Sequence, residues 1–376
     1  MRLLQDANGL VMCFTGGKPF RHYRDNAAAA QPMNYFGGAE SDDEMFGGSA
    51  EFENEEEVFG GADNEIFDAE GGASDMYGSD ALLEGGGLTD EIKKIEKQFG
   101  EKTECSFAQD ASKGELCSPP EIQEKIQEVA AIVESDSKKV ATPEAALEVL
   151  KKKFDCDTES CVLKGLVHRD YAKYINSSDV EEALTRYFKP RGPADNFGLL
   201  SNFNIDGVLD QYAQKYKNFL HIPFQMRDFE KNQTDLASGQ FNISETFSKY
   251  ETFGCVLNTD LSTGRGIHWF CIFGDARDKK NITLEYFNSS GKAPLPEVAE
   301  WMQKQHHLFE QSNPNKKLNV IRVADSALQD DDHSCGVWCL AYIWLRLRDV
   351  PIKWFTPRNV NDSIMHKLRS FIFIAE

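Results

Sequence analysis

Four polar residues in the last third of the chain fall in an order that suits nucleophilic thiol chemistry. They are His268, Asn288, Gln329 and Cys335. A cysteine nucleophile needs a base that takes its proton, and the base needs a partner that orients it. The oxyanion formed on attack needs a preset hydrogen-bond donor. We therefore expect His268 as the base and Asn288 as its orienting residue, with Cys335 as the nucleophile. Gln329 would be the oxyanion donor, and the set as a whole is typical of a cysteine protease.

Cys335 stands where a polar segment, residues 330–334, gives way to the apolar run Val337–Leu345. This change predicts a helix that starts near Cys335, with Asp332 or Ser334 as a possible cap. A thiol at a helix N-terminus next to a histidine is expected to have a lowered pKa and to be partly thiolate near neutral pH. Cys339 lies one helical turn further on and is expected to be a core residue.

Two predicted strands place the other residues. His268 begins an apolar strand after a Gly-rich loop, and Asn288 ends the next strand along the chain. Strands that meet at the same sheet edge would put Asn288 beside His268, with its side-chain oxygen accepting the Nδ1 proton. Gln329 precedes Cys335 by six residues, so its loop can fold back toward the thiol. Taken one at a time, His268 would be an ordinary histidine at a strand end, Asn288 a turn residue and Gln329 a loop residue. Only their order and spacing together are specific to a catalytic site.

The pattern of apolar residues predicts an α+β fold. Strands rich in aromatic and β-branched residues are expected at 252–257, 267–273, 282–287 and 318–323. Helices are expected at 205–219, 296–309, 335–347 and 359–374. These elements define a core over residues 194–376. Residues 89–193 predict a small, mainly helical unit, and residues 1–88 predict a disordered tail.

The charge of the chain is unevenly placed. The net charge is -20, and residues 40–90 hold 17 Asp and Glu with no Lys or Arg. The acidity therefore belongs to the tail, and no basic stripe marks a nucleic-acid surface, so direct DNA binding is disfavoured. Gly-Gly pairs recur in this tail, three of them followed by alanine, at Ala39, Ala62 and Ala73.

Nine unevenly spaced cysteines do not predict a disulfide framework, so we expect a reducing compartment. Cys156 and Cys161 form one C-x4-C pair without a second pair, which favours two packed or redox-silent thiols over a metal site. No cofactor or metal is expected. The longest apolar run has nine residues, too short for a membrane span, and the N-terminus lacks the apolar core of a signal peptide.

The order His268-Trp269, Asn288, Gln329, Cys335-Gly336 resembles the superfamily of the adenovirus protease and the SUMO-deconjugating proteases. Papain runs in the opposite order. The segments 253–260 and 285–289 are similar to polyprotein-processing cysteine proteases of the African swine fever virus type. The resemblance covers roughly residues 150–376. Around Cys335, the segment 334–339 looks more like the SUMO proteases.

The resemblance implies a helical arm followed by a papain-like core. It implies cleavage of viral structural polyproteins at Gly-Gly-X sites during virion maturation, in the host cytoplasm at assembly sites and in the virion. It assigns the same catalytic roles to the four residues above, and it implies that Asn258 and Trp269 line the substrate channel. The chain's own Gly-Gly-Ala sites in the tail are further candidate substrates.

Two alternatives stay open. One is a deconjugase that removes a ubiquitin-like protein ending in Gly-Gly. The other is a structural virion protein that keeps the fold without activity, against which the presence of all four catalytic residue types argues.

Overall fold

The computed structural model describes residues 2–5, 11–14, 104–106, 116–168, 171–193, 197–357 and 359–374. Near the N-terminus, β1 (Arg2–Gln5) pairs antiparallel with β2 (Val11–Phe14). The prediction of a disordered tail did not include this pair, whose second strand is a run of apolar residues with good strand propensity. The rest of the tail, its Gly-Gly pairs and the first residues of the expected helical unit lie outside the described residues.

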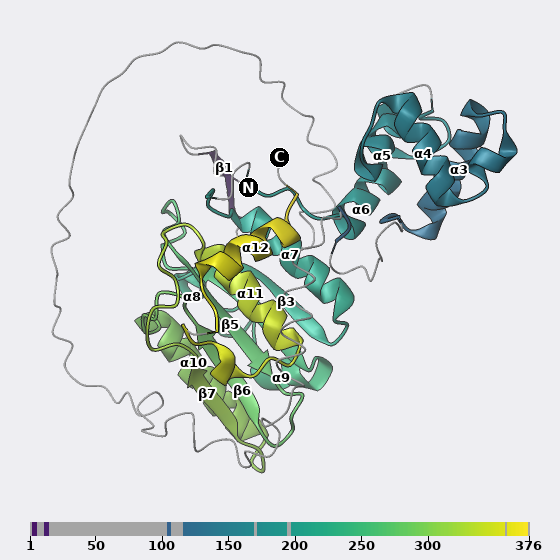
Figure 1. Ribbon diagram of the computed structural model, residues 1–376. Helices are drawn as coiled ribbons and strands as arrows, with labels where there is room; N and C mark the ends of the chain where they lie inside the picture. The colour runs from purple at the N-terminus through teal and green to yellow at the C-terminus, as the bar shows by residue number, and fades with distance from the viewer. Residues whose placement is uncertain are drawn as a thin grey trace, which may run out of the picture.

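Four helices form a separate unit beside the core, the arm (Figure 1). They are α3 (Pro120–Val133), α4 (Pro143–Phe154), α5 (Glu159–His168) and α6 (Ser177–Tyr187), with a short 3-10 turn η2 (Ser137–Val140). Proline opens α3 and α4, where its missing N–H costs nothing. One apolar stripe of each helix packs into a shared core of buried residues between Cys105 and Phe188. The expected boundaries at 88 and 193 stay predictions.

Disulfides tie the arm together, which corrects the expectation from the cysteine count. Cys105 is bonded to Cys117, and Cys156 to Cys161. The expectation of two packed or redox-silent thiols at 156 and 161 is therefore wrong. The composition argument averaged over the whole chain, whereas these four cysteines gather in one small helical unit. Short covalent loops of this kind stabilise such a unit by restricting its unfolded state.

The core is built on one mixed five-stranded sheet. Its strands are β3 (Phe219–Met226), β4 (Thr252–Asn258), β5 (Trp269–Asp275), β6 (Ile282–Phe287) and β7 (Leu318–Arg322), in spatial order β3-β4-β5-β6-β7. The central pairs β4–β5 and β5–β6 are antiparallel, and the outer pairs β3–β4 and β6–β7 are parallel. The antiparallel pairing brings the start of β5 and the end of β6 to one edge of the sheet.

Helices cover both faces of the sheet, so β4 and β6 are buried throughout. On one face lie α7 (Asn202–Lys215), α11 (Cys335–Leu347) and α12 (Asp362–Ile372). On the other lie α9 (Ile243–Lys249) and α10 (Pro296–Ser312), beside the short helix α8 (Phe229–Asn232). A short 3-10 turn, η3 (Ile352–Trp354), follows α11. The arrangement is a three-layer α+β fold with α11 crossing the sheet (Figure 1).

One expected element is displaced. The helix predicted over 205–219 begins earlier, at Asn202, because Ser201 and Asn204 form a reciprocal capping box. It ends at Lys215, and Phe219 instead opens β3, a strand that the periodicity did not indicate. Phe219 packs on the sheet within the same apolar core as α7, so residue type alone could not separate the end of one element from the start of the next.

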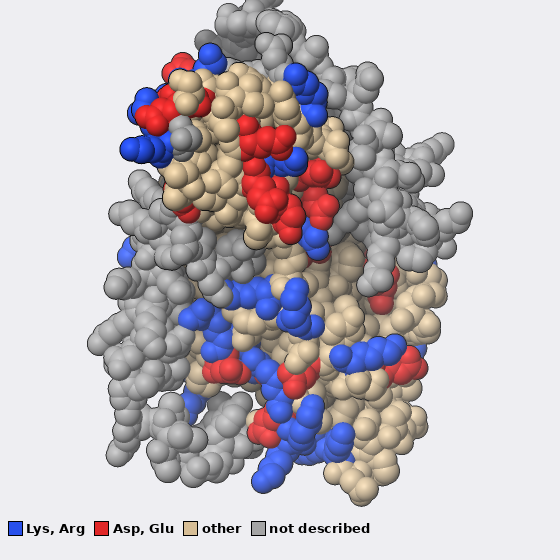
Figure 2. Space-filling model, turned by 90° about the vertical axis from the view of Figure 1, so that its right-hand side faces the viewer, with Lys and Arg blue, Asp and Glu red and all other residues tan. Residues whose placement is uncertain are grey.

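The surface carries mixed charge. Figure 2 views the arm at the top, with Asp and Glu gathered on it and Lys and Arg more frequent on the core below. The two signs are interspersed on the core rather than arranged in a continuous basic stripe on this face. In the described part of the chain, no helix has both the length and the apolar character that crossing a bilayer requires.

Candidate active site

His268 and Asn288 are hydrogen-bonded at the edge of the sheet. The distance from His268 Nε2 to Asn288 Oδ1 is 2.8 Å. His268 directly precedes β5 and Asn288 directly follows β6, so the antiparallel pairing of these strands brings the two side chains together. This confirms the expected juxtaposition of the two residues. Their catalytic roles stay a prediction.

The amide of Asn288 has a fixed orientation, and this decides which ring nitrogen can act as a base. Its Nδ2 donates to the Tyr286 hydroxyl at 3.0 Å, and its Oδ1 accepts from the N–H and the hydroxyl of Ser290. His268 Nε2 must therefore be the N–H donor to Oδ1, which leaves Nδ1 as the unprotonated nitrogen. The expectation that Asn288 binds the Nδ1 proton is wrong, because the ring orientation depends on this network.

A tight loop delivers the chain to His268. Asn258 Oδ1 accepts the N–H groups of Asp260 and Ile267, each at 3.0 Å. Gly266 has φ +87, a left-handed conformation that favours glycine. Asn258 is only 2% exposed, so the structure gives it a positioning role in this loop and leaves little of its surface for substrate.

Trp269 links the sheet edge to the start of α11. Its indole N–H donates to the carbonyl of Leu200 at 3.1 Å. A Cβ on Gly336 would lie 3.1 Å from Leu200 and 3.3 Å from Trp269. A side chain at position 336 would therefore require Leu200 or Trp269 to shift by a few tenths of an ångström. Trp269, which follows His268, lies against Gly336, which follows Cys335. Trp269 is half-buried, which suits the expected wall of a substrate channel.

Cys335 is the first residue of α11 and is 3% exposed. Burial raises the pKa of its thiol to about 11, although the backbone N–H groups of Trp269 and Gly336 act on the sulfur and lower it. The expected lowered pKa is therefore wrong for this resting state, because loss of water around the sulfur outweighs the helix N-terminus. Burial also lowers the pKa of His268, with Lys292 adding to the effect and Asn288 opposing it. The resting pair is thus a neutral thiol and a neutral imidazole.

Gln329 is held beside the Asn288 loop. Its Oε1 accepts from the Ser289 hydroxyl at 2.6 Å, and its backbone N–H donates to the Ser289 carbonyl at 3.1 Å. Its Nε2 donates to the carbonyl and to Oδ1 of Asp331, at 2.8 and 3.1 Å. Both amide protons are therefore engaged in the resting structure, and the oxyanion role predicted for Gln329 needs one of them to turn toward the substrate.

Asp331 organises the segment between Gln329 and Cys335, a role that the sequence did not single out. Its Oδ1 accepts from the N–H of His333 and of Ser334, at 3.1 and 2.8 Å. Its Oδ2 accepts from the hydroxyl of Ser334 and from His366. Burial acts to raise the pKa of Asp331, but these hydrogen bonds outweigh it and hold the pKa well below its usual range. Ser334 is the N-cap residue of α11, yet its hydroxyl binds Asp331 rather than the helix.

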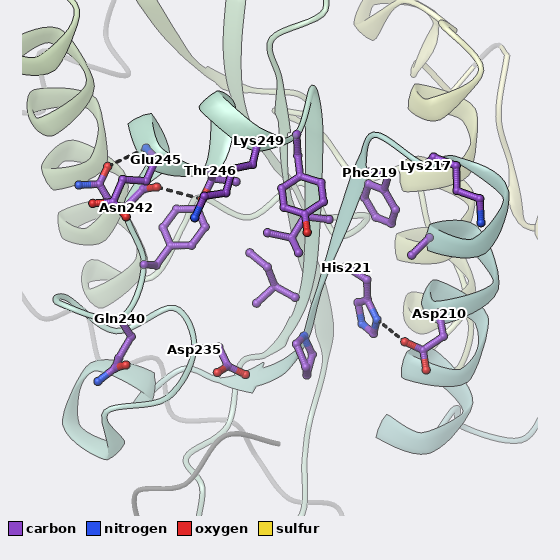
Figure 3. Close-up of a pocket in the computed structure, with 16 residues that line it drawn as sticks. Asp210, Lys217, Phe219, His221, Asp235, Gln240, Asn242, Glu245, Thr246 and Lys249 are labelled. Carbon is purple, nitrogen blue, oxygen red and sulfur yellow. Dashed lines mark hydrogen bonds and ion pairs between the residues drawn. The ribbon is translucent and has the colours of Figure 1, made fainter. Parts of the chain in front are cut away.

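A separate hollow of about 640 Å³ lies beside β3, and none of the four candidate residues lines it (Figure 3). Its lining includes His221, whose ring lies between two carboxylates, with Nδ1 2.9 Å from Asp210 and Nε2 3.2 Å from Asp206. Burial alone would lower the pKa of His221, but the two aspartates raise it to about 9. A charged imidazole locked in this way is a poor general base at neutral pH, so this hollow is not the candidate catalytic centre.

Known proteins are similar to this chain in sequence and in fold. No protein-family model matches the chain. The SUMO-1 cysteine protease of African swine fever virus, isolate Tick/South Africa/Pretoriuskop Pr4/1996, is 36% identical over 250 residues, which cover 63% of this chain and 90% of the relative. The chain belongs to this family of viral cysteine proteases.

A solved structure from the same family agrees with the fold described above. The crystal structure of the African swine fever virus protease superposes with a TM-score of 0.60 at 28% sequence identity, covering 75% of this chain and 99% of the other. As a member of this viral family, the chain is a cysteine protease with an α+β core. Both the resemblance noted from the motifs and the predicted fold class are confirmed.

Proposed function

We propose that this viral cysteine protease is an endopeptidase that cleaves viral structural polyproteins after Gly-Gly during virion maturation. The observation that carries the proposal is the His268–Asn288 hydrogen bond at the sheet edge, which engages Nε2 and leaves Nδ1 as the nitrogen without a proton. Cys335 lies at the start of α11, close to the residue that follows His268. A base with a fixed tautomer and a nucleophile at a helix start are the parts that acyl transfer requires.

The neutral resting pair favours general-base catalysis over a preformed thiolate. Among the described residues, no hydrogen bond joins the His268 ring to the Cys335 sulfur, and such bonds often tighten only when substrate binds. As the sulfur attacks the scissile carbonyl carbon, the thiol proton passes to Nδ1 of His268. Asn288 then stabilises the imidazolium through Nε2–H. His268 returns the proton to the leaving amine, which departs and leaves a thioester.

Water completes the reaction. With His268 again neutral, Nδ1 takes a proton from a water molecule while the water oxygen attacks the thioester carbonyl carbon. The bond from that carbon to the Cys335 sulfur then breaks, and His268 returns the proton to the sulfur. In both steps the oxyanion would be stabilised by the backbone N–H of Cys335 and by Nε2 of Gln329 after it releases Asp331. Hydrogen-bond donors contribute most where negative charge develops, and the backbone N–H is the donor that needs no rearrangement.

Close packing around the thiol supports a substrate with glycine at the cleaved bond. Leu200 and Trp269 lie so near Gly336 that a single added methyl there would be crowded. A Gly-Gly substrate suits a narrow channel, because a side chain at either position would clash with the channel walls. Two exposed apolar side chains, Ile267 beside His268 (74% exposed) and Leu199 (62% exposed), offer apolar surface to the substrate residues that precede Gly-Gly.

The name of the African swine fever virus relative, a SUMO-1 cysteine protease, favours a second candidate, a deconjugase. The two functions differ in the bond that is cut: an α-peptide bond inside a chain, or an isopeptide bond to a lysine side chain. The host cytoplasm and the virion are the proposed sites of action for the polyprotein protease.

The test uses paired substrates with the full chain. A linear peptide with an internal Gly-Gly-Ala site is compared with an isopeptide in which a Gly-Gly carboxyl group is joined to a lysine side chain. The control for each substrate carries alanine in place of the second glycine. We expect the linear Gly-Gly site to be cut faster, with the new N-terminus at the residue after Gly-Gly, and no product from Cys335→Ala. Faster cleavage of the isopeptide would favour the deconjugase, and cleavage that ignores the second glycine would reject the Gly-Gly proposal.

A further inference from the structure

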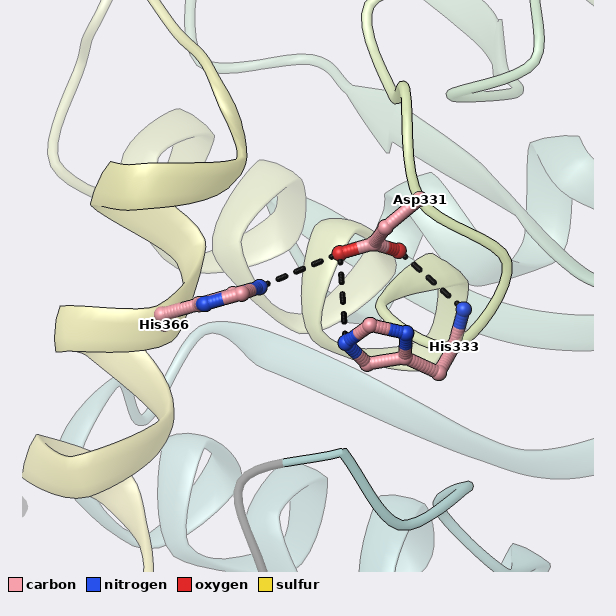
Figure 4. A group of neighbouring side chains, drawn as sticks. All are labelled: Asp331, His333 and His366. Carbon is pink, nitrogen blue, oxygen red and sulfur yellow. Dashed lines mark hydrogen bonds and ion pairs between the residues drawn. The ribbon is translucent and has the colours of Figure 1, made fainter.

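Three side chains with metal-binding atoms converge next to the catalytic segment (Figure 4). Asp331 and His333 precede Cys335 in the chain, and His366 comes from α12. Their ligating atoms all lie within 4.8 Å of one another. Asp331 Oδ2 is 3.1 Å from His366 Nε2 and 3.4 Å from His333 Nε2. Two imidazoles thus point at one carboxylate oxygen.

The ring of His333 provides an independent observation. Its Nδ1 lies 3.2 Å from Asp332 Oδ1, and the carboxylate can only accept, so Nδ1 carries the proton. The other nitrogen, Nε2, is buried and has no hydrogen-bond partner among the described residues. This nitrogen is 3.4 Å from Asp331 Oδ2, so a buried imidazole nitrogen and a carboxylate oxygen face the same small space. A carboxylate on the far nitrogen of a histidine is also the common support of a metal ligand.

Two of the three separations between ligand atoms fit a small tetrahedral ion, and the third is within 4.8 Å. With zinc–ligand distances of about 2.0–2.1 Å, neighbouring ligand atoms in a tetrahedral site stand about 3.3 Å apart. The two separations from Asp331 Oδ2, 3.1 and 3.4 Å, bracket this value. We propose that Asp331, His333 and His366 bind a divalent transition-metal ion of the zinc type, with water as the fourth ligand.

The donor set selects the class of ion. Two imidazoles and one carboxylate suit zinc and its first-row neighbours, whereas calcium and magnesium prefer sites made of oxygen atoms alone. Phe197 contacts both rings edge-on, with ring centroids 5.1 Å from His333 and 6.0 Å from His366, and so restricts how they turn. The site was not visible in the sequence, because His366 is 35 residues from Asp331 and reaches it only through the packing of α12.

Binding would fasten α12 to the segment that carries Gln329 and Cys335. Asp362, at the start of α12, already accepts the N–H groups of Asp330 and Asp331 through Oδ2, at 2.8 and 3.0 Å. A metal ion on Asp331 and His366 adds a second link between the same two elements. Because the ion binds only the folded arrangement, it stabilises that arrangement in proportion to its occupancy.

The experiment measures metal binding directly and does not depend on proteolysis. The untagged full chain carrying Cys335→Ala removes the candidate catalytic thiol as a competing ligand. Titration with Zn²⁺ in a calorimeter should show one ion per chain at this site. Co²⁺ bound in its place should give visible absorption typical of tetrahedral nitrogen and oxygen ligands, without the intense near-ultraviolet band of a thiolate ligand.

Substitutions in the Cys335→Ala background assign the ligands. His366→Gln keeps a donor to Asp331 but is a poor ligand, and His333→Gln removes the unpartnered nitrogen. Each should weaken zinc binding at least about 10-fold, since even the loss of an outer-shell partner costs about 10–100-fold. His306→Ala, which removes a histidine paired with Glu310 on the surface of α10, is the matched control and should bind as before.

Two outcomes would overturn the proposal. One is the absence of zinc binding to the folded Cys335→Ala chain, which would mean that a second proton on the His333 ring occupies the gap. The other is binding by His366→Gln and His333→Gln that is as tight as binding by His306→Ala. Zinc should also raise the melting temperature of the Cys335→Ala chain and of His306→Ala, but not that of the two ligand variants.

Discussion

Glu285 and Arg346 form a buried, bidentate ion pair, which joins the sheet to the helix that begins at the candidate nucleophile. Arg346 Nε donates to Glu285 Oε2 at 2.9 Å, and its NH2 group donates to Oε1 at 2.8 Å. The Tyr342 hydroxyl donates to the same carboxylate, and Asp275 accepts a further bond from Arg346. Glu285 lies three residues before Asn288, and Arg346 lies on α11. The pair therefore fixes the helix that begins at Cys335 against the strand that ends just before Asn288.

Glu285→Ala should destabilise the protein strongly. It leaves Arg346 buried with only a part of its counter-charge, and breaking one side of a buried pair costs about 3–5 kcal/mol. The free energy of unfolding, measured by urea denaturation, is the readout. Glu182→Ala, which breaks an exposed pair with Arg186, is the control and should change stability little. A comparable loss in both variants would contradict the role given to Glu285.

Cys335→Ala and His268→Ala should each lower kcat/KM by about 10⁴-fold or more, because a nucleophile and its base act as a unit. Cys339→Ala should keep most activity, since Cys339 is fully buried beside Cys271 in the core. Cleavage of a Gly-Gly-Ala peptide by folded variants is the measurement. Alkylation of Cys339 rather than Cys335 by a thiol probe would show that the nucleophile is misassigned.

The acidic limb of kcat/KM should have its midpoint below pH 6.5. Only neutral His268 can accept the thiol proton, and its pKa is lowered from 6.5, chiefly by burial. Activity is therefore present above that pKa and is lost as the pH falls through it. Asn288→Ala removes a hydrogen bond that raises the pKa, so the limb should move to lower pH. Lys292→Gln removes a charge that lowers it, so the limb should move up.

Asn288→Asp supplies the matching control for the pH prediction. A carboxylate accepts the same Nε2–H, so the variant should remain active, with its acidic limb at higher pH than in the wild type. The loss of activity in Asn288→Ala should also be smaller than in Cys335→Ala. An acidic limb that stays in place in Asn288→Ala, Asn288→Asp and Lys292→Gln would mean that another group controls it.

Gln329→Ala should lower kcat by about 100-fold with little change in KM, because an oxyanion donor acts on charge that develops only in the transition state. Ser289→Ala tests whether the Ser289 hydroxyl positions the Gln329 side chain, since this hydroxyl donates to Gln329 Oε1. It should lower kcat by a smaller factor. An effect on KM alone would assign Gln329 to substrate binding.

The Gly-Gly-Ala sites with their second glycine at Gly38, Gly61 and Gly72 should be cut by the enzyme itself. The sequence predicts a disordered tail at these sites, and a disordered segment can enter a protease cleft more easily than a packed one. Intact-mass spectrometry of wild type and Cys335→Ala, purified identically, is the measurement. Fragments should appear only with the active thiol. A full-length wild-type chain that still cuts other Gly-Gly peptides would reject self-cleavage.

The sequence alone determined the elements that carry chemistry. The apolar runs that became β4, β5 and β6 are nearly continuous because β4 and β6 are buried throughout and β5 is buried in large part, and such runs can be seen without a structure. The polar-to-apolar change at Cys335 marked the start of α11 for the same reason. Order and spacing were enough to nominate the four candidate residues, since each stands at the end of an element or in a loop beside one.

Only the tertiary structure decided what depends on contacts between distant segments. The tautomer of His268 follows from the bond of Asn288 to Tyr286, and the raised pKa of Cys335 follows from how completely the surrounding residues exclude water. The disulfides of the arm and the approach of His366 to Asp331 likewise join residues whose separation in the chain carries no signal. Hydrogen-bond direction and burial are properties of the packed molecule, because both depend on which groups surround a side chain and not on its neighbours in sequence.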